Sequence, residues 1–217
     1  LGAQPPLSAM DSCICMGASI SALHGFNTAR GQQSAKQSVA VIGDSTFIHS
    51  GITGLIDIVY NQGQSTVIIL DNSITGMTGH QDNPTTGRTI RGDVTTAVSL
   101  EKLCEAIGVR HVDVCDPADM AATEQMIARH LLLEEPSVII ARRPCALLKS
   151  VKHHLPFSID QNRCTGCKMC LRIGCPAISL KEGKAAIDRS LCVGCGLCSQ
   201  MCRFGAIQDG EGAQRDV

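Results

Sequence analysis

Cysteine is concentrated near the C-terminal end of this chain, and this feature constrains the fold more than any other. Of thirteen cysteines in 217 residues, eight lie between positions 164 and 202. Residues 1–20 show no basic, apolar and small-residue pattern that would direct the chain to an oxidising compartment. Because disulfides persist mainly in such compartments, we expect the cysteines to serve metal or redox chemistry.

The eight cysteines form an internal repeat. Residues 159–183 (IDQNRCTGCKMCLRIGCPAISLKEG) can be laid over residues 187–212 (IDRSLCVGCGLCSQMCRFGAIQDGEG), and each segment contains C-x-x-C-x-x-C followed by a fourth cysteine. Two-residue gaps let one tight loop direct three sulfurs at one inorganic cluster, whereas a fourth sulfur must come from elsewhere. Zinc fits less well, because its four ligands would leave the third cysteine of each triplet unused.

The repeat resembles the bacterial two-cluster ferredoxin, in which each [4Fe–4S] cluster takes its fourth cysteine from the other repeat. The resemblance implies two ligand sets: Cys164, Cys167, Cys170 and Cys202 for one cluster, and Cys175, Cys192, Cys195 and Cys198 for the other. The chain departs from that pattern in the longer gap between Cys170 and Cys175, and in Arg203, where proline is usual. Neither departure removes a ligand.

The remaining cysteines are isolated. We expect Cys104, Cys115 and Cys145 to be buried as small apolar residues, since isolated cysteines commonly pack in this way. Cys13 and Cys15 either border a site or pack, and packing is the favoured interpretation.

Upstream of the repeat, strand patterns alternate with helix patterns. Val- and Ile-rich runs typical of buried strands stand at 38–44, 65–71, 109–116 and 136–142. Helical spacing occupies 17–30, 51–63, 99–108 and 117–132. This alternation predicts an α/β domain, with a parallel sheet covered by helices on both faces and ligands at the carboxyl ends of its strands.

The composition changes after residue 141, where basic residues and prolines replace apolar periodicity. We therefore expect the parallel-sheet domain at 1–145, a linker at 146–156 and a small α+β two-cluster ferredoxin domain at 157–217. Between Asp71 and Asp93 runs a long polar, glycine-rich loop. A loop of this length after a strand end favours a functional role.

Two strand ends carry groups suited to a metal and a phosphate. Gly43, Asp44 and Ser45 follow one strand, and Asn72 follows the next. This pair resembles the motif of the thiamine diphosphate enzymes, which begins G-D-G and ends in N-N, with Ser45 and Asp71 departing from it. Taken singly, Asp44 could cap a helix and Asn72 could form a turn.

The resemblance implies a magnesium site formed by Asp44, Asn72 and the main-chain carbonyl of Ile74, since Mg²⁺ prefers oxygen ligands shared with phosphates. The diphosphate is expected against glycine-rich backbone and the start of the first helix. The implied cofactor-binding residues are Gly17, Ala18, Ser19, Gly43, Asp44, Ser45, Asn72, Ile74, Thr75, Gly76 and Met77. His80 is a candidate catalytic proton carrier and His49 a weaker one, although either could simply hydrogen-bond backbone.

Together the two modules resemble the alpha subunit of indolepyruvate ferredoxin oxidoreductase over essentially the whole chain, including the G-M-T-G and P-T-T-G segments between Gly76 and Gly87. The resemblance implies oxidative decarboxylation of an arylpyruvate such as indolepyruvate with coenzyme A, giving acyl-coenzyme A, carbon dioxide and reduced ferredoxin. It also implies a beta subunit and an upstream domain holding the glutamate that activates thiamine. The chain, which opens at Leu1, would then be a fragment or a short subunit, inactive alone.

Two alternatives remain at this stage. The chain could be a ferredoxin-type electron carrier fused to a diphosphate-binding domain without thiamine chemistry, or its substrate could be another 2-oxoacid such as pyruvate. The formal net charge of −1 gives no electrostatic case for nucleic acid or an anionic membrane as a partner. No apolar run approaches the roughly 18 residues of a spanning helix, so we expect a cytoplasmic protein.

Overall fold

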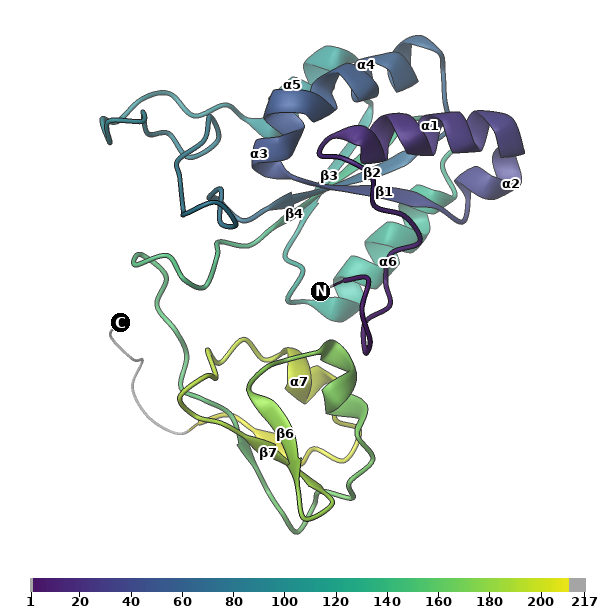
Figure 1. Cartoon of the computed structure of the whole chain (residues 1–217). Coiled ribbons are helices and arrows are strands. Elements are labelled where there is room, and N and C mark those ends of the chain that lie inside the picture. The colour runs from purple at the N-terminus through teal and green to yellow at the C-terminus, as the bar shows by residue number, and fades with distance from the viewer. Residues whose placement is uncertain (1, 211–217) are drawn as a thin grey trace. The chain divides into compact units, whose positions relative to one another are not determined.

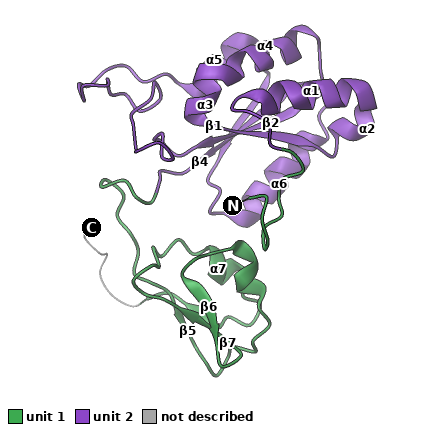
Figure 2. Cartoon of the chain, in the orientation of Figure 1, with its two compact units in different colours: residues 1–12, 146–217 green, residues 13–145 purple. Residues whose placement is uncertain are grey.

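The structure is a computed structural model and describes residues 2–210. It divides into two compact units (Figure 2): Cys13–Cys145, which we call the sheet unit, and the rest of the described chain, which we call the cysteine unit. Residue 1 of the domain expected at 1–145, and the last seven residues of the one expected at 157–217, lie outside the described residues. Residues 2–12, which the sequence boundaries assign to the first domain, lie in the cysteine unit.

The sheet unit alternates strands and helices as its sequence predicts. Its elements, in chain order, are α1 (Ala18–Arg30), α2 (Gln32–Ala35), β1 (Val39–Gly43), α3 (Asp44–Thr46), the π-helical turn η1 (Phe47–Gly51), α4 (Ile52–Tyr60), β2 (Thr66–Asp71), α5 (Leu100–Ile107), β3 (His111–Cys115), α6 (Met120–Leu131) and β4 (Ser137–Arg142). All strand pairs are parallel, in the order β1-β2-β4-β3. The predicted α/β class is confirmed.

Helices cover both faces of the sheet (Figure 1), with α1, α4 and α5 on one face and α6 on the other. The larger core lies on the first face and includes Ile20, Phe47, Leu55, Ile69 and Ile140. A smaller core on the second face packs Ile68 and Ile139 against Met126 and Ile127 of α6. The central strands β2 and β4 are apolar on both faces, which explains why their sequences read as continuous Val- and Ile-rich runs.

One helix begins earlier than its sequence suggests. The spacing predicts a helix from Gly51, whereas α3, η1 and α4 make helical structure run on from Asp44 to Tyr60. The turn from β1 into this helix therefore contains no loop. Asp44 becomes the first helical residue, and a carboxylate is favoured there by the helix dipole.

The cysteine unit shows the repeat of its sequence in its backbone. Its elements are β5 (Ser158–Ile159), the 3-10 turn η2 (Met169–Ile173), β6 (Ile178–Lys181), β7 (Lys184–Ile187), α7 (Leu197–Gln200) and β8 (Ile207–Gln208). Each repeat thus gives a strand, a helical turn and a strand. The outer strands β5 and β8 pair antiparallel, and β6 and β7 form a hairpin.

Candidate functional site

The ends of two neighbouring strands bring the predicted metal ligands into one region. Gly43, the last residue of β1, is the register partner of Leu70 in β2, so Asp44 and Asp71 follow adjacent positions. Asp44 is only 3% exposed and Asp71 only 6%. Two carboxylates and the amide of Asn72 therefore stand at the carboxyl edge of the parallel sheet, where ligands of such sheets bind.

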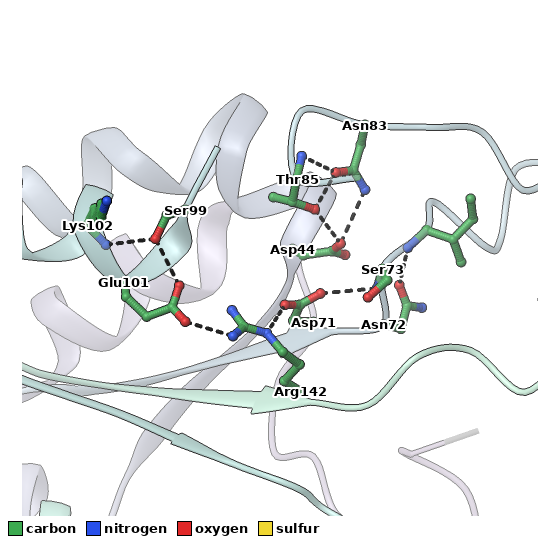
Figure 3. A network of polar contacts seen from close by, with 11 residues as sticks. Asp44, Asp71, Asn72, Ser73, Asn83, Thr85, Ser99, Glu101, Lys102 and Arg142 are labelled. Carbon is green, nitrogen blue, oxygen red and sulfur yellow. Dashed lines mark hydrogen bonds and ion pairs between the residues drawn. The ribbon is translucent and has the colours of Figure 1, made fainter. Parts of the chain in front are cut away.

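Asp44 accepts hydrogen bonds from the long loop that follows β2 (Figure 3). Asn83 Nδ2 and Thr85 Oγ1 each lie 3.2 Å from Asp44 Oδ2, and Thr85 Oγ1 also lies 2.6 Å from Asn83 Oδ1. Asp44 does not cap this helix, because the N-cap residue is Gly43 and no side chain forms a capping hydrogen bond there. Both side-chain contacts, from Asn83 and Thr85, fall on Oδ2 of Asp44.

Burial raises the pKa of the Asp44 carboxyl above its ordinary value, and the negative charge of Asp71 raises it further. Hydrogen bonds from the Ser45 backbone, Asn83 and Thr85 oppose this increase by favouring the ionised form. A buried carboxylate that depends on donors for its charge is well suited to a cation, because a divalent ion would stabilise the ionised form directly.

The turn after β2 is held by its own polar groups. Ser73 N donates to Asp71 Oδ1 at 3.1 Å, and Ile74 N donates to Asn72 Oδ1 at 3.2 Å. The second contact is the turn-forming role considered for Asn72 from sequence. An amide oxygen has a second lone pair, so this hydrogen bond leaves Asn72 able to bind a cation as well.

The start of α1, where we expect the diphosphate, packs closely against η1. Gly17 has φ of +90°, and a Cβ there would lie 2.3 Å from Ser50 Oγ, so a side chain at this position would collide with η1. The helix has no side-chain cap. The Ala18 N–H already donates to Cys15 O at 3.1 Å, so the predicted anion contact at this terminus rests on Ser19. Ser50 links this terminus to the helix that Asp44 begins, since its Oγ lies 3.4 Å from Met16 O and 3.2 Å from Thr46 O.

The remaining predicted residues differ in their surroundings. Thr75 belongs to the Asp44 network, because Asn83 Nδ2 lies 3.4 Å from its Oγ1. Ser45 and Gly76 are half-buried beside the two strand ends, and Ile74 is buried. Met77 and His80 lie on the exposed part of the loop, and His49 is exposed on η1. The sequence did not identify Asn83 or Thr85; the P-T-T-G segment and the length of the loop were the only signals.

The cysteines of each predicted set are neighbours, while their role as cluster ligands stays a prediction. Burial raises the pKa of the Cys170 thiol, and the neighbouring thiols that add to this are Cys164, Cys167 and Cys202. Burial likewise raises the pKa of Cys198 to about 12, with further contributions from Cys195, Cys192 and Cys175. Each buried thiol therefore interacts with the triplet partners of its own repeat and with one cysteine of the other.

The backbone around the first cysteine set contains glycines with positive φ and an N–H donor to sulfur. Cys164, Cys167, Cys170 and Cys202 line one small pocket. Gly166 and Gly194 occupy equivalent repeat positions with φ of +70° and +69°, and a Cβ on Gly166 would lie 2.4 Å from Gly183 O. Ala206 N donates to Cys202 Sγ at 3.3 Å. Positive φ within a C-x-x-C loop and N–H groups directed at sulfur suit an iron–sulfur cluster.

Within residues 2–210, no three His, Cys, Asp or Glu side chains are grouped so that they could hold a metal ion, so the two cysteine sets stay predicted cluster ligands. None of the helices in the same range is long and apolar enough to cross a membrane.

Comparison with protein families assigns the sheet unit to a class. The family "Thiamine pyrophosphate enzyme, C-terminal TPP binding domain" matches residues 1–141, and the "4Fe-4S binding domain" family matches residues 185–208, which contain the second cysteine repeat. The chain therefore belongs to the thiamine pyrophosphate enzymes and carries a 4Fe-4S binding domain as well. The predicted binding of thiamine diphosphate and of iron–sulfur is confirmed at this level.

More particular similarities point to one subunit. The chain is 38% identical to the indolepyruvate oxidoreductase subunit IorA of Pyrococcus horikoshii, over 97% of this chain and 36% of that protein. It is 39% identical to the IorA subunit of Archaeoglobus fulgidus, over 96% of this chain and 34% of that protein. The chain thus spans about a third of the length of these relatives, and matches the portion expected from its motifs.

A solved structure shares the fold. The 2-oxoglutarate:ferredoxin oxidoreductase of Magnetococcus marinus superposes with a TM-score of 0.52 at 17% identity, covering 60% of this chain and 46% of that chain. The similarity supports the parallel-sheet architecture with helices on both faces.

Proposed function

We propose that this chain is the cofactor-binding and electron-transfer portion of a 2-oxoacid:ferredoxin oxidoreductase. The reaction is the oxidative decarboxylation of indolepyruvate, or a related arylpyruvate, with coenzyme A to acyl-coenzyme A, carbon dioxide and reduced ferredoxin. The observation that carries the proposal is the buried Asp44 carboxylate at a strand end beside Asn72, in the same chain as two cysteine sets. Similarity to indolepyruvate oxidoreductase subunits supports the aryl substrate.

The sheet unit would hold the diphosphate end of the cofactor. Asp44 supplies a charged oxygen to Mg²⁺, Asn72 a neutral amide oxygen and Ile74 its main-chain carbonyl, a ligand set of the kind that magnesium prefers. Asn83 and Thr85 keep Asp44 oriented through its Oδ2. Ser19 would offer its backbone N–H at the start of α1, where Ala18 N already donates to Cys15 O. When bound, thiamine diphosphate supplies the carbanion chemistry by which a 2-oxoacid loses carbon dioxide.

The cysteine unit would carry the electrons. One [4Fe–4S] cluster takes Cys164, Cys167, Cys170 and Cys202, and the other takes Cys175, Cys192, Cys195 and Cys198. The N–H donor from Ala206 to Cys202 would stabilise charge on that sulfur and tune the cluster potential. Each set draws on both repeats, so neither repeat can complete a cluster alone.

Turnover would need more than these residues. The relatives are about three times as long, and we propose that an upstream domain holding the activating glutamate, a beta subunit and ferredoxin complete the enzyme. His80, exposed on the loop after β2, is our candidate proton carrier at the substrate side.

The proposal is tested by titrating the anaerobically prepared chain with thiamine diphosphate and Mg²⁺ in a calorimeter. We expect binding that Asp44→Ala abolishes, and that Asp57→Ala, which removes an exposed carboxylate on α4, leaves intact. Iron and sulfide counts are made on the same samples. A folded chain with intact clusters and no thiamine diphosphate binding would overturn the proposal and favour the fused electron carrier. Pyruvate outcompeting indolepyruvate in the complete enzyme would overturn only the substrate.

A further inference from the structure

Arg142 joins two strand ends without being one of the expected ligands. It is the last residue of β4 and the register partner of Asp71. Its Nε donates to Asp71 Oδ2 at 2.6 Å and its Nη1 donates to Glu101 Oε1 at 2.7 Å (Figure 3). Because a guanidinium presents its donors in a rigid planar fork, one side chain can hold both carboxylates at once.

Asp71 is a buried carboxylate whose cationic partner is Arg142. Its side chain is 7% exposed, and it lies at the strand end beside the buried Asp44. Two buried carboxylates at adjacent strand ends repel each other, and a buried carboxylate without a partner is strongly destabilising. Position 71 is also where the thiamine motif has asparagine, so the charge is a departure for which this chain must compensate.

The Arg142–Asp71 pair controls the turn that carries the expected metal ligands. Asp71 Oδ1, the oxygen that does not face Arg142, accepts from Ser73 N. Backbone N–H groups just past Arg142 complete the attachment, since Arg143 N donates to Asp71 O and Cys145 N donates to Asn72 O, both at 2.9 Å. Fixing Asp71 therefore fixes the path of the chain through Asn72 and Ile74.

We propose that Arg142 is a positioning residue for the magnesium and diphosphate site. It keeps Asp71 as the anchor of the turn and prevents that carboxylate from acting as a competing metal ligand beside Asp44. Glu101, held in turn by Ser99 Oγ at 3.1 Å, fixes the far side of the guanidinium. This inference rests on the function proposed above.

The test compares Arg142→Met, Asp71→Asn and the double variant with the unmodified chain, all with intact clusters. Arg143→Met is the matched control, because Arg143 is adjacent in sequence but pairs with Asp116 at a site where both side chains are exposed. Mn²⁺ serves as a paramagnetic substitute for Mg²⁺, and its binding in the presence of thiamine diphosphate is measured by electron paramagnetic resonance. Hydrogen exchange of the 71–76 peptide is measured without cofactor.

We expect Arg142→Met to weaken Mn²⁺ binding about tenfold to a hundredfold, as does the loss of groups that orient metal ligands. The control should stay within about twofold, because exposed ion pairs contribute little. The double variant should recover most of the loss, since it leaves no unpaired buried charge and asparagine can still accept from Ser73. Exchange at 71–76 should accelerate in Arg142→Met only.

Equal Mn²⁺ affinity in Arg142→Met and the unmodified chain, or no recovery in the double variant, would overturn the inference and leave the proposed function standing. No Mn²⁺ or thiamine diphosphate binding by the unmodified chain would overturn the proposed function instead. The exchange experiment then still decides whether Arg142 positions the turn. If Arg142→Met does not fold, Arg142→Lys takes its place, with charge kept and the fork lost; unchanged binding and exchange there would overturn the inference.

Discussion

The hydrophobic cores of the two units differ in composition. The core of the sheet unit consists of aliphatic and aromatic side chains such as Ile69 and Ile140, both fully buried. In the cysteine unit, Cys170 and Cys198 are themselves core residues, and further expected cluster ligands pack against them. The core of the first unit contains none of the expected cluster ligands, whereas the core of the second mixes those ligands with apolar residues such as Phe157, Ile178 and Ile207. We therefore expect the stability of the cysteine unit to depend on its clusters more than that of the sheet unit.

The largest expected effect follows from removing iron. Cys170→Ala, or chelation of iron, should unfold much of the cysteine unit, because binding free energy is folding free energy where the ligands form the core. Cys104→Ala is the matched control: Cys104 is a buried cysteine of α5, in the sheet unit. Hydrogen exchange read peptide by peptide should show loss of protection at 158–208 and retained protection in β1, β2 and β4. Equal protection of the cysteine unit with and without iron would remove the contrast.

A substitution in the core of the sheet unit should destabilise that unit and leave the clusters intact. Ile140→Ala should lower the free energy of unfolding of the sheet unit by about 2–5 kcal/mol, since Ile140 is fully buried and its loss leaves a cavity. Ile56→Ala, at a position 48% exposed on α4, should cost far less. Urea unfolding followed by circular dichroism measures the loss, and the iron and sulfide content should remain unchanged. Iron loss in step with sheet unfolding would show that the units are not separately stabilised.

The sequence predicted the parts of each unit that depend on local patterns. Apolar runs predicted all four strands to within two residues at either end, and the repeat predicted the grouping of cysteines around Cys170 and Cys198. The position of Asp44 directly after β1 was predicted as well, because a motif fixes it there, while its role as a metal ligand stays a prediction.

Contacts between distant segments could not be read in the same way. Asn83 and Thr85 reach Asp44 across 39 and 41 positions of sequence, and Arg142 reaches Asp71 across 71. A polar loop and an arginine at a strand end have many possible partners, and the folded arrangement of the chain selects among them; for Arg142 it is the register of β4 with β2. The early start of the helix at Asp44 was missed because Gly51 looked like a helix start, whereas Ile42 and Phe47 pack closely around it in the core.

A moderate effect is expected where the loop holds Asp44. Thr85→Val keeps the shape of the side chain but removes the donor to Asp44 Oδ2, so Mn²⁺ binding with thiamine diphosphate should weaken about tenfold. Thr78→Val, which removes a contact to Gln81 in the exposed part of the same loop, is the control. Electron paramagnetic resonance titration measures both. The stability of the cysteine unit should not change, and an equal loss in both variants would contradict a specific role for Thr85.

The smallest expected effect concerns Glu101, which should make the stability of the sheet unit depend on pH. The hydrogen bond from Arg142 lowers the pKa of Glu101 from 4.5 to about 2. A carboxyl whose folded-state pKa is depressed binds fewer protons folded than unfolded, so its stabilisation is fully present above about pH 4.5 and is lost as pH falls toward 2. Glu101→Gln should therefore flatten the acid side of the stability curve for the sheet unit, whereas Glu105→Gln, on the exposed side of α5, should not. Exchange protection of β2 and β4 across this pH range measures the slope, and identical slopes for both variants would show that the Arg142 pair contributes nothing to stability.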